Sequence, residues 1–313
     1  MSRATIFPGQ GSQAVGMGES LAEAFAPARQ VFEEVDDALS ENLSRLMWEG
    51  PESELTLTEN AQPAIMALSM AIIRVLEAEF GFDISKHSCL AAGHSVGEYS
   101  ALCAVGAFTL SDTARLLRIR GRSIQEAVPA GVGAMSALIG LEMEAVEAAC
   151  AESKDSGVVV IANDNAPGQI VVSGHKEAVE KAGESAKAKG ARRVIPLNVS
   201  GPFHSPLLAP AGEAMAEALS AVVIRPLAVP IVSNITAAVI SEPDRIRELL
   251  VAQVTGRVRW RESVATFRSL GAGMTVEAGG NKVLTGMVKR IDKELETVSL
   301  DSPADVEAFA GTL

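Results

Sequence analysis

The feature that most constrains the fold is a serine between two glycines, in the stretch AAGHSVGEYSA at residues 91–101. The apolar residues 87–93 predict a buried strand before it, and the small residues of 96–108 predict a helix after it. A serine in the sharp turn between a strand and a helix is typical of a nucleophile elbow, in which Gly93 and Gly97 allow close approach. The stretch therefore predicts an α/β fold with Ser95 as a nucleophile, and a chance match to a short pattern is the alternative.

The order of the predicted elements indicates a large domain that holds a smaller one. Residues 134–199 read as strand, helix, strand, strand, helix and strand, which is the βαββαβ order of ferredoxin-like domains. We therefore expect an inserted domain at 132–199 and a larger α/β domain, with a mostly parallel sheet, made of 1–131 and 200–313. In the larger domain we expect strands at 4–7, 229–236, 274–279 and 296–300, and helices at 19–38, 62–80, 206–221, 243–255, 260–270 and 281–292.

Charge and composition exclude several classes of protein. A net charge of −12 and 4% aromatic residues disfavour a nucleic-acid binder, which needs basic grooves and stacking rings. The longest apolar run, residues 64–73, is far shorter than the ~18–20 residues that cross a bilayer, and the N-terminus has no signal-peptide pattern. The three cysteines show no disulfide or metal spacing, so we expect a cytoplasmic protein without a metal or cofactor.

A serine nucleophile needs a base, and the chain has four histidines. His94 should diverge from Ser95 around the turn, His175 opens a helix, and His87 precedes a strand. His204 lies in the glycine- and proline-rich loop NVSGPFHSPLL, where a catalytic loop at a strand end would lie, so elimination favours it as the base. A third member of the set could be Asp112, Asp155, Asp164 or a backbone carbonyl, and the sequence leaves these alternatives open.

Arg120 is the residue that says most about the substrate. At about 100° per residue, Arg115, Arg118 and Arg122 share one sector of the helix, which we interpret as a solvated face. Arg120 lies on the apolar side, between Leu116 and Ile124. Because a buried guanidinium needs an anion, Arg120 predicts either a structural ion pair or a clamp for a substrate carboxylate.

The glycine-rich loop FPGQGSQ at residues 7–13 follows the first strand. It lacks the Gly-Lys-Ser/Thr ending of a phosphate-binding loop and the Gly-x-Gly-x-x-Gly spacing, so a nucleotide site is disfavoured. Its backbone amides could instead supply an oxyanion donor opposite the N–H of Val96.

Five motifs together resemble the malonyl-CoA:acyl carrier protein transacylases of bacterial fatty-acid synthesis. They are FPGQGSQ, GHSVGEYSA, RIRGRSIQ, VSGPFHS and QVTGRVRW, in that order, and the resemblance runs from about residue 5 to 292. It implies an α/β-hydrolase-like catalytic domain with a ferredoxin-like insertion, which agrees with the division above. It also implies an acyltransferase whose partners are malonyl-CoA and holo-acyl carrier protein.

The resemblance also assigns roles to residues. Ser95 resembles the nucleophile, His204 the base, and Gln253 the residue whose backbone carbonyl orients that base. Arg120 resembles the arginine that binds the malonyl carboxylate. The remaining matched positions are Gln10 and Val96 at the oxyanion hole, Phe203 as a mark of malonyl selectivity, and Asn163 and Asn165 at the mouth of the cleft.

Carrier proteins are typically acidic, so an acidic enzyme needs a local basic patch to meet one. The candidates are Arg115, Arg118 and Arg122; Lys187, Lys189, Arg192 and Arg193; and Lys289 with Arg290. Two other functions stay open: a serine hydrolase or thioesterase that uses the same pair with water, and a non-catalytic carrier-binding module. The sequence does not separate fatty-acid from polyketide synthesis.

Overall fold

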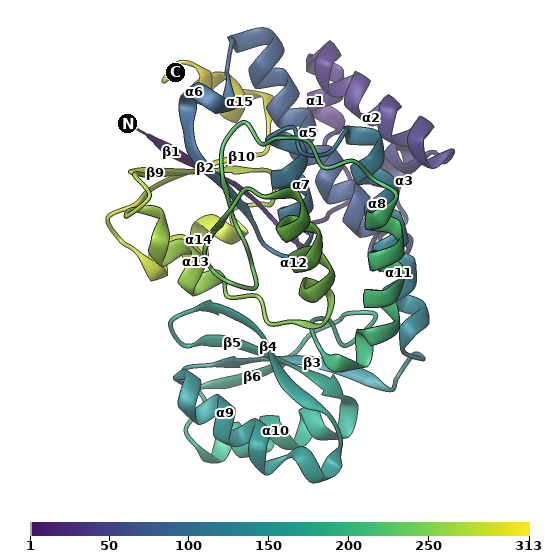
Figure 1. Cartoon of the computed structure of the whole chain (residues 1–313), viewed down its shortest axis with the longest axis vertical. Helices are drawn as coiled ribbons and strands as arrows, with labels where there is room; N and C mark the ends of the chain where they lie inside the picture. The colour runs from purple at the N-terminus through teal and green to yellow at the C-terminus, as the bar shows by residue number, and fades with distance from the viewer. Residues whose placement is uncertain (1) are drawn as a thin grey trace.

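Six strands form the central sheet of the computed structural model, which describes residues 2–313 (Figure 1). Their spatial order is β10-β9-β1-β2-β7-β8, and neighbours are parallel except for the antiparallel pair β7–β8. The predicted α/β fold with a mostly parallel sheet is therefore confirmed. The strands are β1 (Arg3–Phe7), β2 (Ser88–Gly93), β7 (Ile231–Val232), β8 (Val239–Ile240), β9 (Met274–Ala278) and β10 (Glu296–Leu300).

Strands β1 and β2 bring two distant loops together. They pair in parallel, with Ile6 opposite Ala92 and Phe7 opposite Gly93, so both strands end at the same edge of the sheet. The loop after β1 and the turn after β2 therefore lie side by side. This edge holds the site described below.

Helices cover both faces of this sheet. The longest, α5 (Thr58–Phe80), is apolar on nearly all sides from Ala61 to Ile73, and it is correspondingly buried between the sheet and the outer helices α2 and α8. The other helices are α1 (Glu19–Ala24), α2 (Ala26–Leu39), α3 (Leu43–Glu49), α4 (Glu52–Leu55), α6 (Ile84–His87), α7 (Val96–Ala104), α8 (Leu110–Ala127), α11 (Ala209–Ser220), α12 (Pro243–Thr255), α13 (Trp260–Phe267), α14 (Val283–Ile291) and α15 (Pro303–Ala310). Among the described residues, no helix is long and apolar enough to cross a membrane.

A second, antiparallel sheet has the order β4-β5-β3-β6 and lies at the lower end of the molecule in Figure 1. Alternate residues of β5 face opposite ways: Ile170 and Val172 pack under the two helices of this part, whereas Val171 joins the main core. Its elements, in chain order, are β3 (Gly133–Ile139), α9 (Met143–Glu152), β4 (Val159–Ala166), β5 (Gln169–His175), α10 (Lys176–Ala188) and β6 (Arg193–Pro196).

The end of β4 is tied to the segment that precedes α13. The N–H of Asp164 donates to the carbonyl of Val258 over 2.9 Å, and the N–H of Val258 donates to the carbonyl of Ala162 over 2.8 Å. The buried carboxylate of Asp164 also accepts two bonds from Nε of Arg261, at 2.9 and 3.0 Å. These bonds hold the strand that carries Asn163 against α13 and the segment before it.

Several predicted boundaries were wrong. The helix expected at 19–38 is two helices, α1 and α2, because the chain is extended at Phe25 and Pro27 stands in the first turn of α2. The strand expected at 229–236 has only the two residues of β7, because Ser233 and Asn234 make other bonds. Helix α5 begins four residues before the expected start.

Candidate active site

Ser95 occupies the turn between β2 and α7, with φ 53° and ψ −103°. This conformation is rare for a residue with a side chain. The two glycines make it possible, because a Cβ at Gly93 would lie 1.9 Å from the carbonyl of Gly97, and one at Gly97 would lie 2.0 Å from the carbonyl oxygen of Phe7. The strained turn projects the serine hydroxyl from the sheet edge.

Asn234 holds this turn in place, and the sequence analysis did not identify it. The backbone N–H of Ser95 donates to Oδ1 of Asn234 over 2.7 Å, and Nδ2 of Asn234 donates to the carbonyl of Gly93 over 2.6 Å. One side chain thus bridges the residues on either side of the bend. The sequence feature that could have indicated Asn234 is the polar pair Ser233-Asn234, which comes directly after an apolar strand at the carboxyl edge of the sheet.

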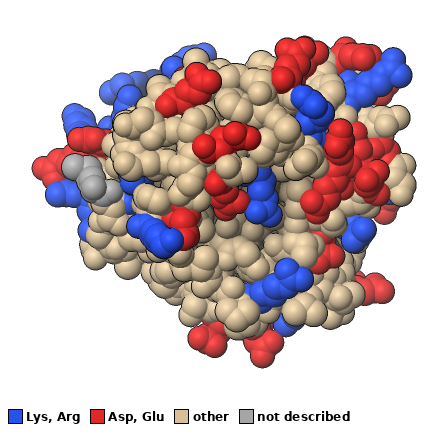
Figure 2. Space-filling model, turned by 90° about the horizontal axis from the view of Figure 1, so that it is seen from above, with Lys and Arg blue, Asp and Glu red and all other residues tan. Residues whose placement is uncertain are grey.

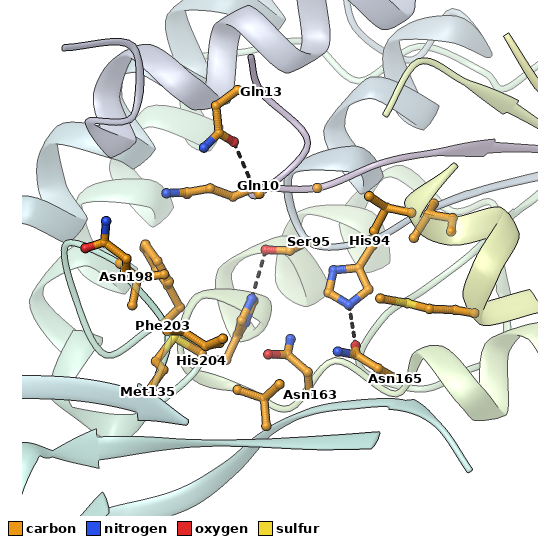
Figure 3. A pocket seen from close by; sticks show the side chains of 18 of the residues that line it. Gln10, Gln13, His94, Ser95, Met135, Asn163, Asn165, Asn198, Phe203 and His204 are labelled. Carbon is orange, nitrogen blue, oxygen red and sulfur yellow. Dashed lines mark hydrogen bonds between the residues drawn. The ribbon is translucent and has the colours of Figure 1, made fainter. Parts of the chain in front are cut away.

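The hydroxyl of Ser95 meets His204 and, through it, Gln253. Oγ of Ser95 lies 2.8 Å from Nε2 of His204 (Figure 3). Nδ1 of His204 lies 2.8 Å from the backbone carbonyl of Gln253. A carbonyl can only accept, so Nδ1 carries the proton and Nε2 is free to accept one from Ser95. Burial, together with the nearby charge of Arg120, lowers the pKa of His204 to about 3, which keeps the imidazole neutral and able to act as a base.

The other histidines and acids lie elsewhere. His87 bonds within its own turn at Asp83, and His175 accepts from the N–H of Val158. Asp164 pairs with Arg261, as described above, and Asp112 lies on the surface beside Arg115. The group at Nδ1 of His204 is therefore a backbone carbonyl, and none of the acids considered from the sequence occupies that place.

Arg120 is 1% exposed and lies beside Ser95. Its guanidinium donates to Oγ of Ser95 and Oε1 of Gln253, each over 3.0 Å, and to Oε1 of Gln62 over 2.9 Å. The Tyr99 ring lies 5.7 Å from its central carbon. All these partners are neutral, and within residues 2–313 Arg120 forms no ion pair with a carboxylate. The site thus holds a buried cation without a direct anionic partner.

Arg118 shows what a structural arginine on the same helix looks like. The prediction of a solvated face was wrong for this residue, which is 5% exposed. It pairs with Glu41 at 2.7 Å and donates to the carbonyl of Glu59 over 2.8 Å. Arg122 pairs with the same two glutamates, so this cluster is largely neutralised.

Two backbone amides next to Ser95 have no protein acceptor among the described residues. Val96 is the first residue of α7, and Gln10 lies in the loop after β1, next to Ser95 in Figure 3. In the part of the chain that the structure describes, neither N–H donates to another group. The loop is shaped by a bond from the N–H of Gly11 to Oε1 of Gln13, 2.8 Å long. A free N–H at a helix start and a second one in a neighbouring loop suit a developing negative charge.

These groups open into a cavity of about 290 Å³. Phe203 and Met135 form one side of it, and Asn163 and Asn165 form another (Figure 3). Nε2 of His94 lies 2.8 Å from Oδ1 of Asn165, so the imidazole donates and fixes the orientation of this amide. His94 therefore lines the pocket, a role that the sequence analysis did not assign to it. Across residues 2–313, His, Cys, Asp and Glu side chains form no group of three that could hold a metal ion.

Comparisons with known proteins agree along the whole chain. Residues 5–313 match the family described as the acyl transferase domain. The malonyl CoA-acyl carrier protein transacylase of Bacillus subtilis (strain 168) is 44% identical over 311 residues, which cover 99% of this chain and 96% of the relative. The protein of the same name from Escherichia coli (strain K12) is 41% identical over 305 residues, 97% of each chain.

Solved structures give the same result. The acyl-carrier-protein-S-malonyltransferase from Bartonella henselae superposes with a TM-score of 0.97 and 52% identity, over 100% of this chain and 99% of that one. A malonyl-transacylase solved in complex with its type II PKS acyl-carrier protein superposes with a TM-score of 0.96 and 40% identity, over all of both chains.

Proposed function

The chain belongs to the malonyl CoA-acyl carrier protein transacylases of the acyl transferase family, and we propose that it transfers malonyl through an ester on Ser95. It is an acyltransferase that moves a malonyl group from malonyl-CoA to acyl carrier protein. The residue-level proposal rests mainly on two groups that contact the hydroxyl oxygen of Ser95. Oγ of Ser95 lies 2.8 Å from the base His204 and 3.0 Å from the buried cation of Arg120.

The first half-reaction makes the ester. Nε2 of His204 takes the proton of Ser95 as Oγ attacks the thioester carbonyl, and the resulting oxyanion accepts from the N–H groups of Gln10 and Val96. The C–S bond then breaks, and coenzyme A leaves with the proton from His204. Nδ1 stays bonded to the carbonyl of Gln253 throughout, which holds the ring and its tautomer.

The second half-reaction reverses these steps with a different thiol. The phosphopantetheine thiol of the carrier gives its proton to His204, and its sulfur attacks the ester carbonyl. The Oγ–C bond breaks, and Ser95 recovers its proton from His204. The products are malonyl-carrier and free enzyme, so the cycle is ping-pong.

Arg120 gives the site its preference for malonyl. A carboxylate on the acyl chain would be the first anion to contact this guanidinium, and it would do so next to the bond that reacts. Fixing the acyl tail also restricts the ester to a few poses, which favours a positioned thiol over diffusing water. Phe203, which is 9% exposed in the cavity wall, limits the room for a branch on the acyl chain.

Asn163 and Asn165 are proposed to bind the substrate near the mouth of the cavity. The bond from His94 leaves the Nδ2 group of Asn165 as a donor within the cavity (Figure 3). A thioester substrate with amide carbonyls along its arm offers acceptors for such donors.

We also propose that the chain has two domains. Its βαββαβ order and the strand order β4-β5-β3-β6 support a ferredoxin-like domain at 132–199. The elbow at the end of a parallel strand supports an α/β-hydrolase-like catalytic domain made of 1–131 and 200–313.

The free cysteines Cys89, Cys103 and Cys150 support a reducing, cytoplasmic location.

The carrier is proposed to dock beside α14, because Val283, Leu284 and Met287 of this helix line the cavity. Lys289 on the same helix is exposed and makes no ion pair among the described residues. Its neighbour Arg290 donates to Gln169 and Pro167, so it links α14 to the second sheet. On the face shown in Figure 2, Lys and Arg are dispersed among acidic groups, which favours a small local patch over a broad basic surface.

Two experiments test these proposals. Ping-pong transfer predicts that labelled coenzyme A exchanges into malonyl-CoA without any carrier, and absence of exchange would contradict an ester intermediate. For docking, Lys289→Glu should lower kcat/KM for the carrier and weaken its salt dependence, whereas Arg115→Glu, on α8, should change neither. Equal effects of the two reversals would exclude α14 as the docking face.

A further inference from the structure

Glu98 is a buried carboxylate that the proposed mechanism does not use. It lies in the first turn of α7, three residues after Ser95, and is 1% exposed. Oε2 accepts a bond from Nε2 of Gln253 over 2.6 Å, and Oε1 accepts a longer one from the N–H of Asn234 over 3.4 Å. A carboxylate at this depth requires such donors, because burial alone would expel its charge.

The first partner, Gln253, connects Glu98 to the reacting groups. Its Nε2 also donates to the carbonyl of Ser95 over 3.1 Å, and its Oε1 accepts from Arg120 over 3.0 Å. Its backbone carbonyl is the group that orients His204. The bond from Glu98 therefore fixes which end of the Gln253 amide faces Arg120.

The second partner, Asn234, connects Glu98 to the elbow. The side chain of Asn234 bonds both Ser95 and Gly93, and the carboxylate holds its backbone N–H. Glu98 thus contacts the two residues that position the nucleophile, the base and the cation. It also lies near Arg120 without a direct ion pair, since the Gln253 amide bonds both side chains.

We propose that Glu98 is a positioning residue for acyl transfer, acting through the Gln253 side chain and the Asn234 backbone on Ser95, His204 and Arg120. This rests on the proposed Ser95 ester. The residue type follows from the contacts, because a carboxylate offers two acceptors to two donors. A glutamine of the same size offers one acceptor and one donor, so one of the two N–H groups would face another N–H.

The test is the rate at which Ser95 is acylated by malonyl-CoA, measured by rapid quench and intact-protein mass. Each rate is referred to the fraction of Ser95 that is finally labelled, so that misfolded protein does not count. Glu98→Gln should slow the maximal rate about 10-fold or more, since buried charged hydrogen bonds are lost. The half-saturating malonyl-CoA concentration should stay within about threefold, because Glu98 does not face the coenzyme A arm.

A double-mutant cycle shows whether Glu98 acts through Gln253. Gln253→Ala removes the side chain but keeps the carbonyl that holds His204. In that background, Glu98→Gln should slow acylation by a factor at least about threefold smaller than in the wild type. If Glu98→Gln does not fold, Gln253→Ala alone must slow acylation about 10-fold or more.

The matched control is Glu277→Gln. This buried carboxylate also accepts two N–H groups, from Leu284 and Thr285, but has no contact with the reacting groups. Its rate per labelled site should match the wild type. The positioning role is overturned if Glu98→Gln slows acylation by less than about 10-fold. It is also overturned if Glu98→Gln slows acylation as much in the Gln253→Ala background as in the wild type. Failure of the wild type to form a Ser95 ester would instead overturn the proposed function, so the two failures are distinguishable.

Discussion

Replacing Arg120 with alanine should change which acyl group the enzyme accepts. The guanidinium is 1% exposed and bonded only to neutral oxygens, so the malonyl carboxylate would be its first direct anionic partner. Acetyl-CoA has the same thioester but no carboxylate. The variant should therefore lose malonyl transfer far more than acetyl transfer.

The magnitude follows from burial. Truncating one partner of a buried, hydrogen-bonded charge pair costs about 2–5 kcal/mol. Taking about 3 kcal/mol for this enclosed site gives a loss of ~150-fold in kcat/KM for malonyl-CoA. Arg120 also donates to Oγ of Ser95, and loss of that bond affects both substrates alike. The ratio of malonyl to acetyl kcat/KM isolates the clamp, and it should fall about 100-fold.

The assay measures both rates with the same enzyme and carrier, and Arg118→Ala is the matched control. Arg118 lies on the same helix and is almost as buried, but its charge is satisfied by Glu41 and by the backbone of Glu59. That variant should lower Tm and leave the malonyl-to-acetyl ratio unchanged. A wild-type ratio in Arg120→Ala, or an equal change of the ratio in Arg118→Ala, would exclude a carboxylate clamp at Arg120.

Three further predictions concern the elbow and the buried titratable groups. Gly97→Ala should abolish soluble folding, because the added Cβ would overlap the carbonyl of Phe7, whereas Gly212→Ala has open space around the added atom and should fold normally. Thermal unfolding measures the difference between the two variants. A Gly97→Ala variant of normal stability would contradict the packing at the elbow. Burial raises the pKa of Glu98 from 4.5 to about 7. Between these two pH values Glu98 is therefore protonated in the folded state and ionised in the unfolded state. The free energy of unfolding consequently falls as the pH rises from 4.5 to 7. Relative to the wild type, Glu98→Gln should therefore gain about 3 kcal/mol in unfolding free energy from pH 4.5 to 8, and a difference independent of pH would refute this. The pKa of His204 is lowered from 6.5 to about 3, so between these values only the unfolded state binds a proton at this residue, and the wild-type free energy of unfolding falls as the pH drops below 6.5. The unfolding free energy of His204→Ala should depend less on pH in this range. Parallel curves for the two proteins would contradict this prediction.

Features that depend on local pattern were predictable from the sequence. The turn around Ser95 follows from small residues between an apolar run and a helical run, and burial of Arg120 follows from its direction on α8. Helix α12 was placed at its observed bounds, 243–255. In each case the constraint lies within a few residues of chain.

Features that depend on distant partners were not predictable in the same way. Arg118 pairs with two residues that are far away in the sequence, Glu41 after α2 and Glu59 on α5. No periodicity along α8 shows these pairs. Asn234 is 139 residues from Ser95 and acts through a polar bond with no sequence period. Strand β7 is short for the same reason, since its next residues leave the ladder to bond elsewhere.

The most direct test of transfer through Ser95 is intact-protein mass spectrometry after mixing with malonyl-CoA, followed by addition of holo-acyl carrier protein. Transfer through a Ser95 ester predicts a malonyl-sized adduct that maps to Ser95, persists in buffer and moves to the carrier when the carrier is added. An adduct on another residue, or one that is lost to water as fast without carrier as with it, would contradict transfer through a Ser95 ester.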